Sequence, residues 1–285
     1  MQATNENTTN PEATIIPAQR IVQAFKRAHE EGRGILIPYF MSGYPSAQQS
    51  VKIVVAAAEG GADIIELGMP FSDPLADGAT VQHAGQIALE RGMTINGCMQ
   101  VAHQIAAQVD VPLILMGYYN PILAYGLERF CRTARESGVC GIIVPDLPTE
   151  EALPLREAAI KEGITLIFLI PPTAPNERIA RVVELTASGP GGFIYCVSLS
   201  GVTGARDELP AHLHSFIDRI RGYTKNTNIP LAIGFGLSTP EHVASITRYV
   251  EGAVVGSALV NLIDRNAEDK QVEAVRQYIQ SLAQR

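Results

Sequence analysis

The stretch that decides the fold is IIELGMPFSDPLADG, from Ile64 to Gly78. It begins with a short apolar run of the kind found in strands that are buried on both faces. Proline, aspartate and glycine then follow, which is typical of a loop. The stretch therefore predicts a buried strand and a loop, and it raises the question of what the carboxylate of Glu66 does inside the strand.

The same alternation continues along the chain. Apolar, β-rich runs are separated by segments in which apolar residues recur at helical spacing and a glycine stands near the end. The eight runs cover residues 35–40, 63–69, 111–118, 141–147, 165–172, 192–198, 230–236 and 252–259. Eight βα units in about 250 residues match a (β/α)8 barrel. An open doubly wound sheet is the main alternative, but no G-x-G-x-x-G follows the first run.

The predicted fold is therefore α/β, a single TIM barrel with an extra N-terminal helix and a short phosphate-binding helix after the eighth strand. Residues 1–16 are polar and lack aromatic side chains, so we expect a flexible tail there and one barrel domain over residues 17–285. The chain carries a net charge of −7 with no block of basic residues, which argues against nucleic acid as a partner. No apolar run is long enough to span a membrane, and the four cysteines form no C-x-x-C pair, so we expect a cytoplasmic protein.

In such a barrel the active site lies at the carboxyl ends of the strands. Asp63, Asp110 and Glu251 precede strands and are interpreted as solvated surface groups. Glu66 falls late in its strand, and the period of two places it on the inner face of the barrel, where burial raises the pKa of a carboxyl toward that of a general acid. A structural salt bridge is the alternative. Asp77 on the following loop is, by itself, best explained as a helix cap.

Two glycine motifs predict a phosphate site. Gly234 and Gly236 follow the seventh strand, while Gly256 and Ser257 follow the eighth at the start of a short helix, the usual phosphate cradle of this fold. Tight turns and a serine N-cap are the alternative. Tyr195 ends the sixth strand as a pocket wall or as ordinary core, and the Ser/Gly/Thr-rich segment after it is long enough for a lid.

Residues that are missing from strand ends exclude two mechanisms. A Schiff-base aldolase needs a lysine there, and a metal-dependent enzyme needs clustered histidines or acids. The lysines and histidines all fall elsewhere: Lys26, Lys52, Lys161, Lys225, Lys270, His29, His83, His103, His212, His214 and His242. Metal-free acid/base chemistry by carboxylates on a phosphate-bearing substrate remains.

From Arg20 onward the sequence resembles the tryptophan synthase alpha subunit family, on IIELGMPFSDPLADG, YCVSLSGVTG, GFGLSTPE and GSALV. The resemblance implies retro-aldol cleavage of indole-3-glycerol phosphate to indole and glyceraldehyde 3-phosphate. It makes Glu66 the acid that protonates indole C3 and Asp77 the charge that pairs with the indole N–H. The substrate-binding residues that it implies are Tyr195, Thr203, Gly204, Gly236, Gly256 and Ser257.

The resemblance also implies a partner and a cofactor outside this chain. Family members pair with a beta subunit in an alpha2beta2 heterotetramer, and pyridoxal phosphate belongs to that subunit. Ala79 and Leu199 depart from the residues usual in relatives, and the N-terminal tail is longer. A sugar-phosphate isomerase that uses Glu66 as a base, or a non-catalytic barrel that activates a partner, are the two alternative functions.

Overall fold

The computed structural model describes residues 16–197, 211–234 and 236–283. Within these ranges the strands form a nine-stranded sheet in which every pairing is parallel. The strands are β1 (Ile35–Met41), β2 (Ile65–Gly68), β3 (Leu113–Met116), β4 (Val139–Ile143), β5 (Thr165–Ile167), β6 (Leu169–Ile170), β7 (Ile194–Val197), β8 (Leu231–Gly234) and β9 (Gly252–Val255).

The sheet curls back on itself into a barrel. Its order is β5-β4-β3-β2-β1-β9-β8-β7-β6, and the two end strands are separated along the chain by Phe168 alone. The ninth strand arises because the fifth predicted strand is divided at this residue, whose carbonyl accepts a hydrogen bond from the Tyr195 N–H (2.9 Å). Neighbouring strands follow one another in chain order and β1 pairs with β9, which confirms the barrel. In a doubly wound sheet, the order of the strands would reverse near the centre of the sheet.

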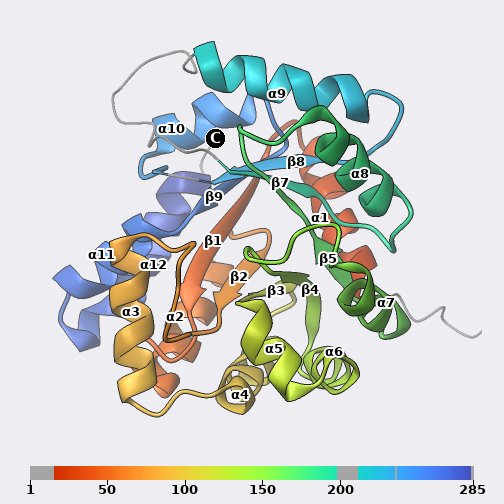
Figure 1. Cartoon of the computed structure of the whole chain (residues 1–285). Helices are drawn as coiled ribbons and strands as arrows, with labels where there is room; N and C mark the ends of the chain where they lie inside the picture. The colour runs from red at the N-terminus through yellow and green to blue at the C-terminus, as the bar shows by residue number, and fades with distance from the viewer. Residues whose placement is uncertain (1–15, 198–210, 235, 284–285) are drawn as a thin grey trace, which may run out of the picture.

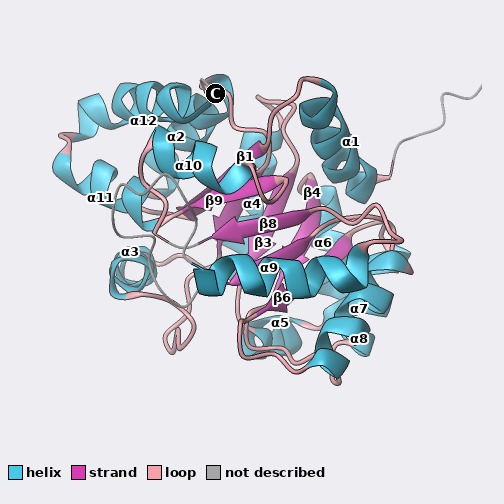
Figure 2. Cartoon of the chain, turned by 90° about the horizontal axis from the view of Figure 1, so that it is seen from above, coloured by secondary structure: helices cyan, strands magenta, loops and turns pink. Residues whose placement is uncertain are grey.

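Helices surround the strands on all sides (Figure 1, Figure 2). The helices are α1 (Pro17–Glu30), α2 (Ala47–Glu59), α3 (Ala79–Glu90), α4 (Ile95–Ala106), α5 (Tyr119–Tyr125), α6 (Leu127–Glu136), α7 (Leu153–Lys161), α8 (Asn176–Ala187), α9 (Ala211–Thr224), α10 (Pro240–Thr247), α11 (Ser257–Arg265) and α12 (Glu268–Ala283). Both helices predicted in addition to the βα units are present, because α1 precedes the first strand and α11 follows the last.

The alternation along β2 sorts its side chains into two cores. Ile65 and Leu67 pack in the layer between barrel and helices, whereas Ile64 lies in the cluster that fills the barrel interior. Helix α1 contributes Ile21 and Phe25 to this interior cluster, and the Phe25 ring lies 5.5 Å from that of Phe193. One end of the barrel is thus closed by α1 with apolar side chains, which leaves the carboxyl ends of the strands for a site.

The prediction that Asp63 is a solvated surface group is wrong. Its side chain is 4% exposed, and both carboxylate oxygens accept hydrogen bonds of 2.8 Å from the Arg33 guanidinium. The carboxylate also accepts the Leu36 N–H at 2.8 Å, so it ties the start of β2 to β1. Asp110, in contrast, is 98% exposed in its pair with Arg20, as predicted.

All four cysteines are buried and unpaired. Among the described residues, no helix combines the length and the apolar character that crossing a bilayer requires.

Candidate active site

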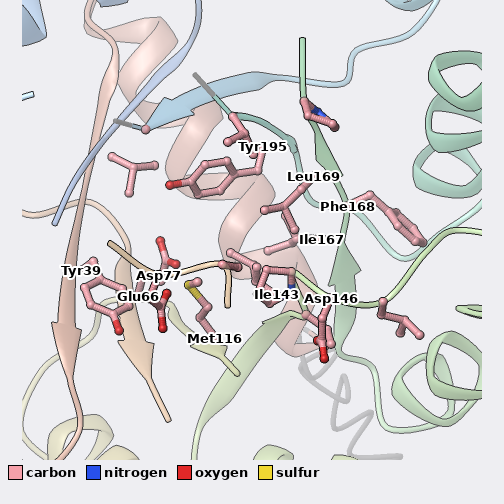
Figure 3. Close-up of a pocket in the computed structure, with 18 of the residues that line it drawn as sticks. Tyr39, Glu66, Asp77, Met116, Ile143, Asp146, Ile167, Phe168, Leu169 and Tyr195 are labelled. Atoms are coloured by element: carbon pink, nitrogen blue, oxygen red, sulfur yellow. The ribbon is translucent and has the colours of Figure 1, made fainter. Parts of the chain in front are cut away.

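A cavity of about 690 Å³ opens at the carboxyl ends of the strands, opposite α1. It brings together residues from all nine strands and from loops that follow them, and Figure 3 shows several of these side chains pointing into it. Among its lining residues are Tyr39, Glu66, Asp77, Met116, Ile143, Tyr195, Gly234, Gly236, Gly256 and Ser257. Of the site residues predicted from the sequence, Thr203 and Gly204 lie outside the described residues, as does Leu199.

Glu66 occupies the middle of β2, in register with Tyr39 of β1 and Ile114 of β3. It is 1% exposed, and its Oε2 atom has no hydrogen-bond partner among the described residues. No cation of the described residues forms an ion pair with it, which argues against the alternative of a structural salt bridge. Burial, and then the charge of Asp77, raise the pKa of Glu66 to about 8. The carboxyl is therefore protonated at neutral pH and available as an acid.

Asp77 lies beside Glu66 in the cavity (Figure 3). The N-cap of α3 is Gly78, and no side chain caps this helix, so the interpretation of Asp77 as a helix cap is wrong. Burial raises the pKa of Asp77 to about 6, and a hydrogen bond with Tyr118 opposes this rise. Near pH 7 the pair therefore consists of a neutral Glu66 and a charged Asp77, two carboxyls with different roles set by their surroundings.

Two tyrosines form walls of the cavity, and each lies over a glycine of the next strand. A Cβ atom at Gly234 of β8 would collide with the hydroxyl of Tyr195 of β7, and one at Gly68 of β2 would collide with that of Tyr39 of β1. Desolvation raises the pKa of both tyrosines well above the ordinary value, so both hydroxyls stay protonated. Because glycine has no Cβ atom, each tyrosine ring fits against the neighbouring strand. Tyr195 lines the cavity, as predicted.

The predicted anion cradle lies on the same cavity. Gly236 adopts a left-handed backbone conformation (φ 70°), so a tight turn is indeed present. Gly256 is the N-cap of α11 and Ser257 is the first residue of that helix, which corrects the alternative of a serine N-cap. The start of α11 thus lies at the cavity, and a helix N-terminus supplies free N–H donors and a partial positive charge to an anion.

The sequence analysis missed polar residues of the cavity lining, among them Tyr39, Asp146, Thr149 and Arg178, and it missed Tyr118, which contacts the loop that carries Asp77. Tyr118 and Asp146 close the third and fourth predicted strands, so the strand-end rule would have found them. Arg178, in the first turn of α8, is the one cationic side chain among the described lining residues. No sequence signal marked Arg178, because it lies eight residues beyond the end of the divided fifth strand and belongs to none of the motifs.

The described lining residues include neither lysine nor histidine. The described part of the chain also contains no group of three histidine, cysteine, aspartate or glutamate side chains placed to hold a metal ion. The carboxyl groups of the lining include those of Glu66 and Asp77, and carboxyl groups are a side-chain type used in acid/base chemistry.

Comparison with known proteins identifies the family. The family model described as tryptophan synthase alpha chain matches residues 25–284. The tryptophan synthase alpha chain of Chloroflexus aggregans is 46% identical over 264 residues, which cover 92% of this chain and 96% of that protein.

Solved structures agree with the sequence match. A chain of tryptophan synthase from Mycobacterium tuberculosis has a TM-score of 0.83 at 32% identity and covers 93% of this chain and 96% of its own length. A chain from the tryptophan synthase a2b2 complex of Pyrococcus furiosus has a TM-score of 0.79 at 38% identity, with coverages of 88% and 98%. This chain belongs to the tryptophan synthase alpha chain family, the carbon–carbon lyases that cleave indole-3-glycerol phosphate to indole and glyceraldehyde 3-phosphate.

Proposed function

We propose that this chain cleaves indole-3-glycerol phosphate by carboxylate acid/base catalysis, with Glu66 and Asp77 as the catalytic residues. The observation that carries the proposal is the presence in one cavity of Asp77 and of a buried Glu66 whose Oε2 atom has no hydrogen-bond partner among the described residues, with pKa values of about 6 and about 8. A retro-aldol cleavage needs a proton donor and a stabilising negative charge at the same time, and this pair offers both near pH 7.

Glu66 acts first as the acid. Its proton goes to C3 of the indole ring, which leaves the ring positively charged. The Glu66 carboxylate then removes the proton from the glycerol hydroxyl next to the bond that breaks. The C–C bond electrons return to the ring, so indole and the aldehyde form and Glu66 is protonated again. A carboxyl whose pKa lies near the working pH exchanges its proton in both directions at low cost.

Asp77 supplies the charge that makes the first step possible. Its carboxylate pairs with the indole N–H while positive charge develops on the ring, and the apolar surroundings strengthen this attraction relative to water. The apolar lining, which includes Met116, Ile143 and Ile167, suits an indole ring.

The substrate phosphate binds at the proposed phosphate-binding residues, which follow β8 and β9. Backbone N–H groups of Gly236, Gly256 and Ser257, with the Ser257 hydroxyl, hold it at the start of α11. Tyr195 holds the substrate from the side. Thr203 as a contact to Asp77 and Gly204 as a further phosphate donor rest on the family resemblance, since both residues lie outside the described part of the chain.

We further propose that the chain works with a tryptophan synthase beta subunit in an alpha2beta2 assembly and passes indole to it, in the cytoplasm. The similarity to a chain of the Pyrococcus furiosus a2b2 complex supports this proposal. Pyridoxal phosphate is assigned to the partner subunit on the family resemblance. The unbroken family match over residues 25–284 supports one barrel domain over residues 17–285, with residues 1–16 as a tail.

The test is to incubate the purified chain with indole-3-glycerol phosphate and to measure indole. Release of indole by the chain, and its loss in Glu66→Gln, is the expected result. An isomerase of a sugar phosphate would leave this substrate intact and release no indole. A non-catalytic barrel would also release no indole, although it would still bind and activate a beta subunit. Absence of indole release by the wild-type chain would therefore overturn the proposal.

A further inference from the structure

Tyr118 holds the loop that carries Asp77 from inside the barrel. Its side chain is buried (4% exposed), and its ring lies 5.2 Å from that of Phe71, at the start of the loop. Its hydroxyl accepts a hydrogen bond from the Ala76 N–H at 2.9 Å, near the end of the loop. The tip between these contacts is open to solvent, since Leu75 is 95% exposed. One side chain from the third βα unit thus fixes both ends of a loop from the second.

The hydroxyl of Tyr118 has one hydrogen to donate after it has accepted the Ala76 N–H. The carboxyl of Asp77, the residue after Ala76, lies close to this hydroxyl, and we take it as the acceptor. A hydrogen bond donated to a carboxylate favours the charged form, and here it opposes the burial that raises the pKa of Asp77. Among the described residues, the charge of Asp77 also acts on Glu66 of β2 and on Tyr39 of β1, and raises the pKa of both. Neither side chain carries a positive charge, so neither can stabilise the Asp77 carboxylate in place of the Tyr118 hydroxyl.

A second contact holds the same loop without touching the Asp77 carboxyl. From the first turn of α3, the Gln82 side-chain amide donates to the carbonyls of Pro74 (3.2 Å) and Asp77 (2.9 Å). The Gln82 side chain is exposed, and both hydrogen bonds go to the main chain. Gln82 therefore orders the loop, whereas Tyr118 orders the loop and also contacts the reactive group.

We propose that Tyr118 is a positioning residue for the cleavage reaction: its hydroxyl holds the Asp77 carboxylate charged and aimed at the indole N–H. This inference rests on the proposed function, because it needs Asp77 to act as a carboxylate on the substrate. It assigns to Tyr118 a role in the chemistry that acts through Asp77 and not through a contact with the substrate.

The test compares Tyr118→Phe with Gln82→Ala across the pH range. Phenylalanine keeps the ring contact with Phe71 and removes only the hydroxyl, so the fold is retained. With one hydrogen bond fewer on its charged form, Asp77 titrates at a higher pH. We expect the acidic limb of kcat/KM to move up by about one pH unit, so that the variant loses about fivefold at pH 6 and little near pH 7.5. Gln82→Ala is expected to leave the limb where the wild-type chain has it.

Carbon-13 NMR titration of the Asp77 carboxyl in the ligand-free protein gives a second readout that does not depend on activity. Its pKa should rise in Tyr118→Phe and stay unchanged in Gln82→Ala. An unmoved Asp77 titration in Tyr118→Phe, or an activity loss of the same factor at every pH, would overturn the role of Tyr118. If the wild-type chain releases no indole, the proposed function fails instead, and the NMR titration still decides whether Tyr118 holds Asp77 charged.

Discussion

Asp63 and Glu66 lie three residues apart, Asp63 just before β2 and Glu66 within it, and the structure gives them opposite environments. Asp63, at the amino end, is buried against Arg33 with both oxygens hydrogen-bonded. Glu66, toward the carboxyl end, is equally buried but has an oxygen without a partner. A paired carboxylate stabilises a fold only through its partner, whereas an unpaired one is retained at a cost in stability and marks a functional site. The predictions below follow from this contrast.

The first prediction concerns the role of Glu66 in turnover. Glu66→Gln keeps the shape of the side chain and removes its proton donor, so indole release should fall by about 10²–10⁴, the range that a general acid contributes. Binding of glycerol phosphate, measured by calorimetry, should stay close to that of the wild-type chain because the cradle lies on β8 and β9. Turnover at the wild-type rate would remove Glu66 from the mechanism.

The second prediction is a stability gain in the same variant. Glu66 titrates near 4.5 when unfolded and at about 8 when folded, so between these values the unfolded chain releases a proton that the folded chain keeps. The wild-type chain therefore loses stability as the pH rises through this window. Glutamine has no charge to bury, and Glu66→Gln should be more stable than the wild-type chain by a few kcal/mol near pH 8.

Urea unfolding of both proteins at pH 4 and pH 8 measures this difference. The two proteins should have nearly the same free energy of unfolding at pH 4, where Glu66 is protonated in both states. A difference that is equal at the two pH values would contradict the assignment of an unpaired, ionisable carboxyl.

The third prediction is the pH dependence of catalysis. Asp77 must be charged and Glu66 must be protonated, so activity should rise as the pH passes about 6 and fall as it passes about 8. The profile of kcat/KM for indole release should therefore be a bell with its maximum near pH 7. A profile that is flat from pH 5 to pH 9 would show that this pair does not limit the reaction.

The fourth prediction concerns the buried ion pair. Asp63→Ala leaves the Arg33 guanidinium and the Leu36 N–H without their partner, so the free energy of unfolding should fall by about 3–5 kcal/mol. Asp110→Ala is the matched control, since it also breaks an aspartate–arginine pair but at a fully open site, and it should cost less than about 1 kcal/mol. Equal losses in the two variants would mean that burial does not distinguish these pairs.

The fifth prediction concerns the room that a glycine leaves for Tyr195. Gly234→Ala places a Cβ against the Tyr195 hydroxyl and 2.9 Å from Val254 Cβ, so the ring must move and substrate binding should weaken by at least about tenfold. Gly222→Ala is the control, because nothing lies within 4 Å of the added atom, and alanine within α9 should stabilise the protein by about 0.5–1 kcal/mol. KM for indole release and thermal unfolding measure the two effects.

The sequence predicted the barrel because a parallel sheet covered by helices produces a regular pattern of residues. Its strands read as apolar runs, its helices read as amphipathic segments, and the alternation along β2 placed Glu66 on the inner face. The division of the fifth strand at Phe168 was not predicted, because nothing in an unbroken apolar run marks where its ladder is interrupted.

The sequence by itself also determined which chemistry this protein supports, since it placed carboxylates and glycines, and no lysine or histidine, at the strand ends. The tertiary structure alone decided what each carboxylate does. Asp63 is paired with Arg33, Glu66 is buried with an oxygen that has no partner among the described residues, and Asp77 lies outside the N-cap of α3 and near Tyr118. The physical reason is that a pKa depends on desolvation and on neighbours from other strands, and neither is encoded in the residue itself.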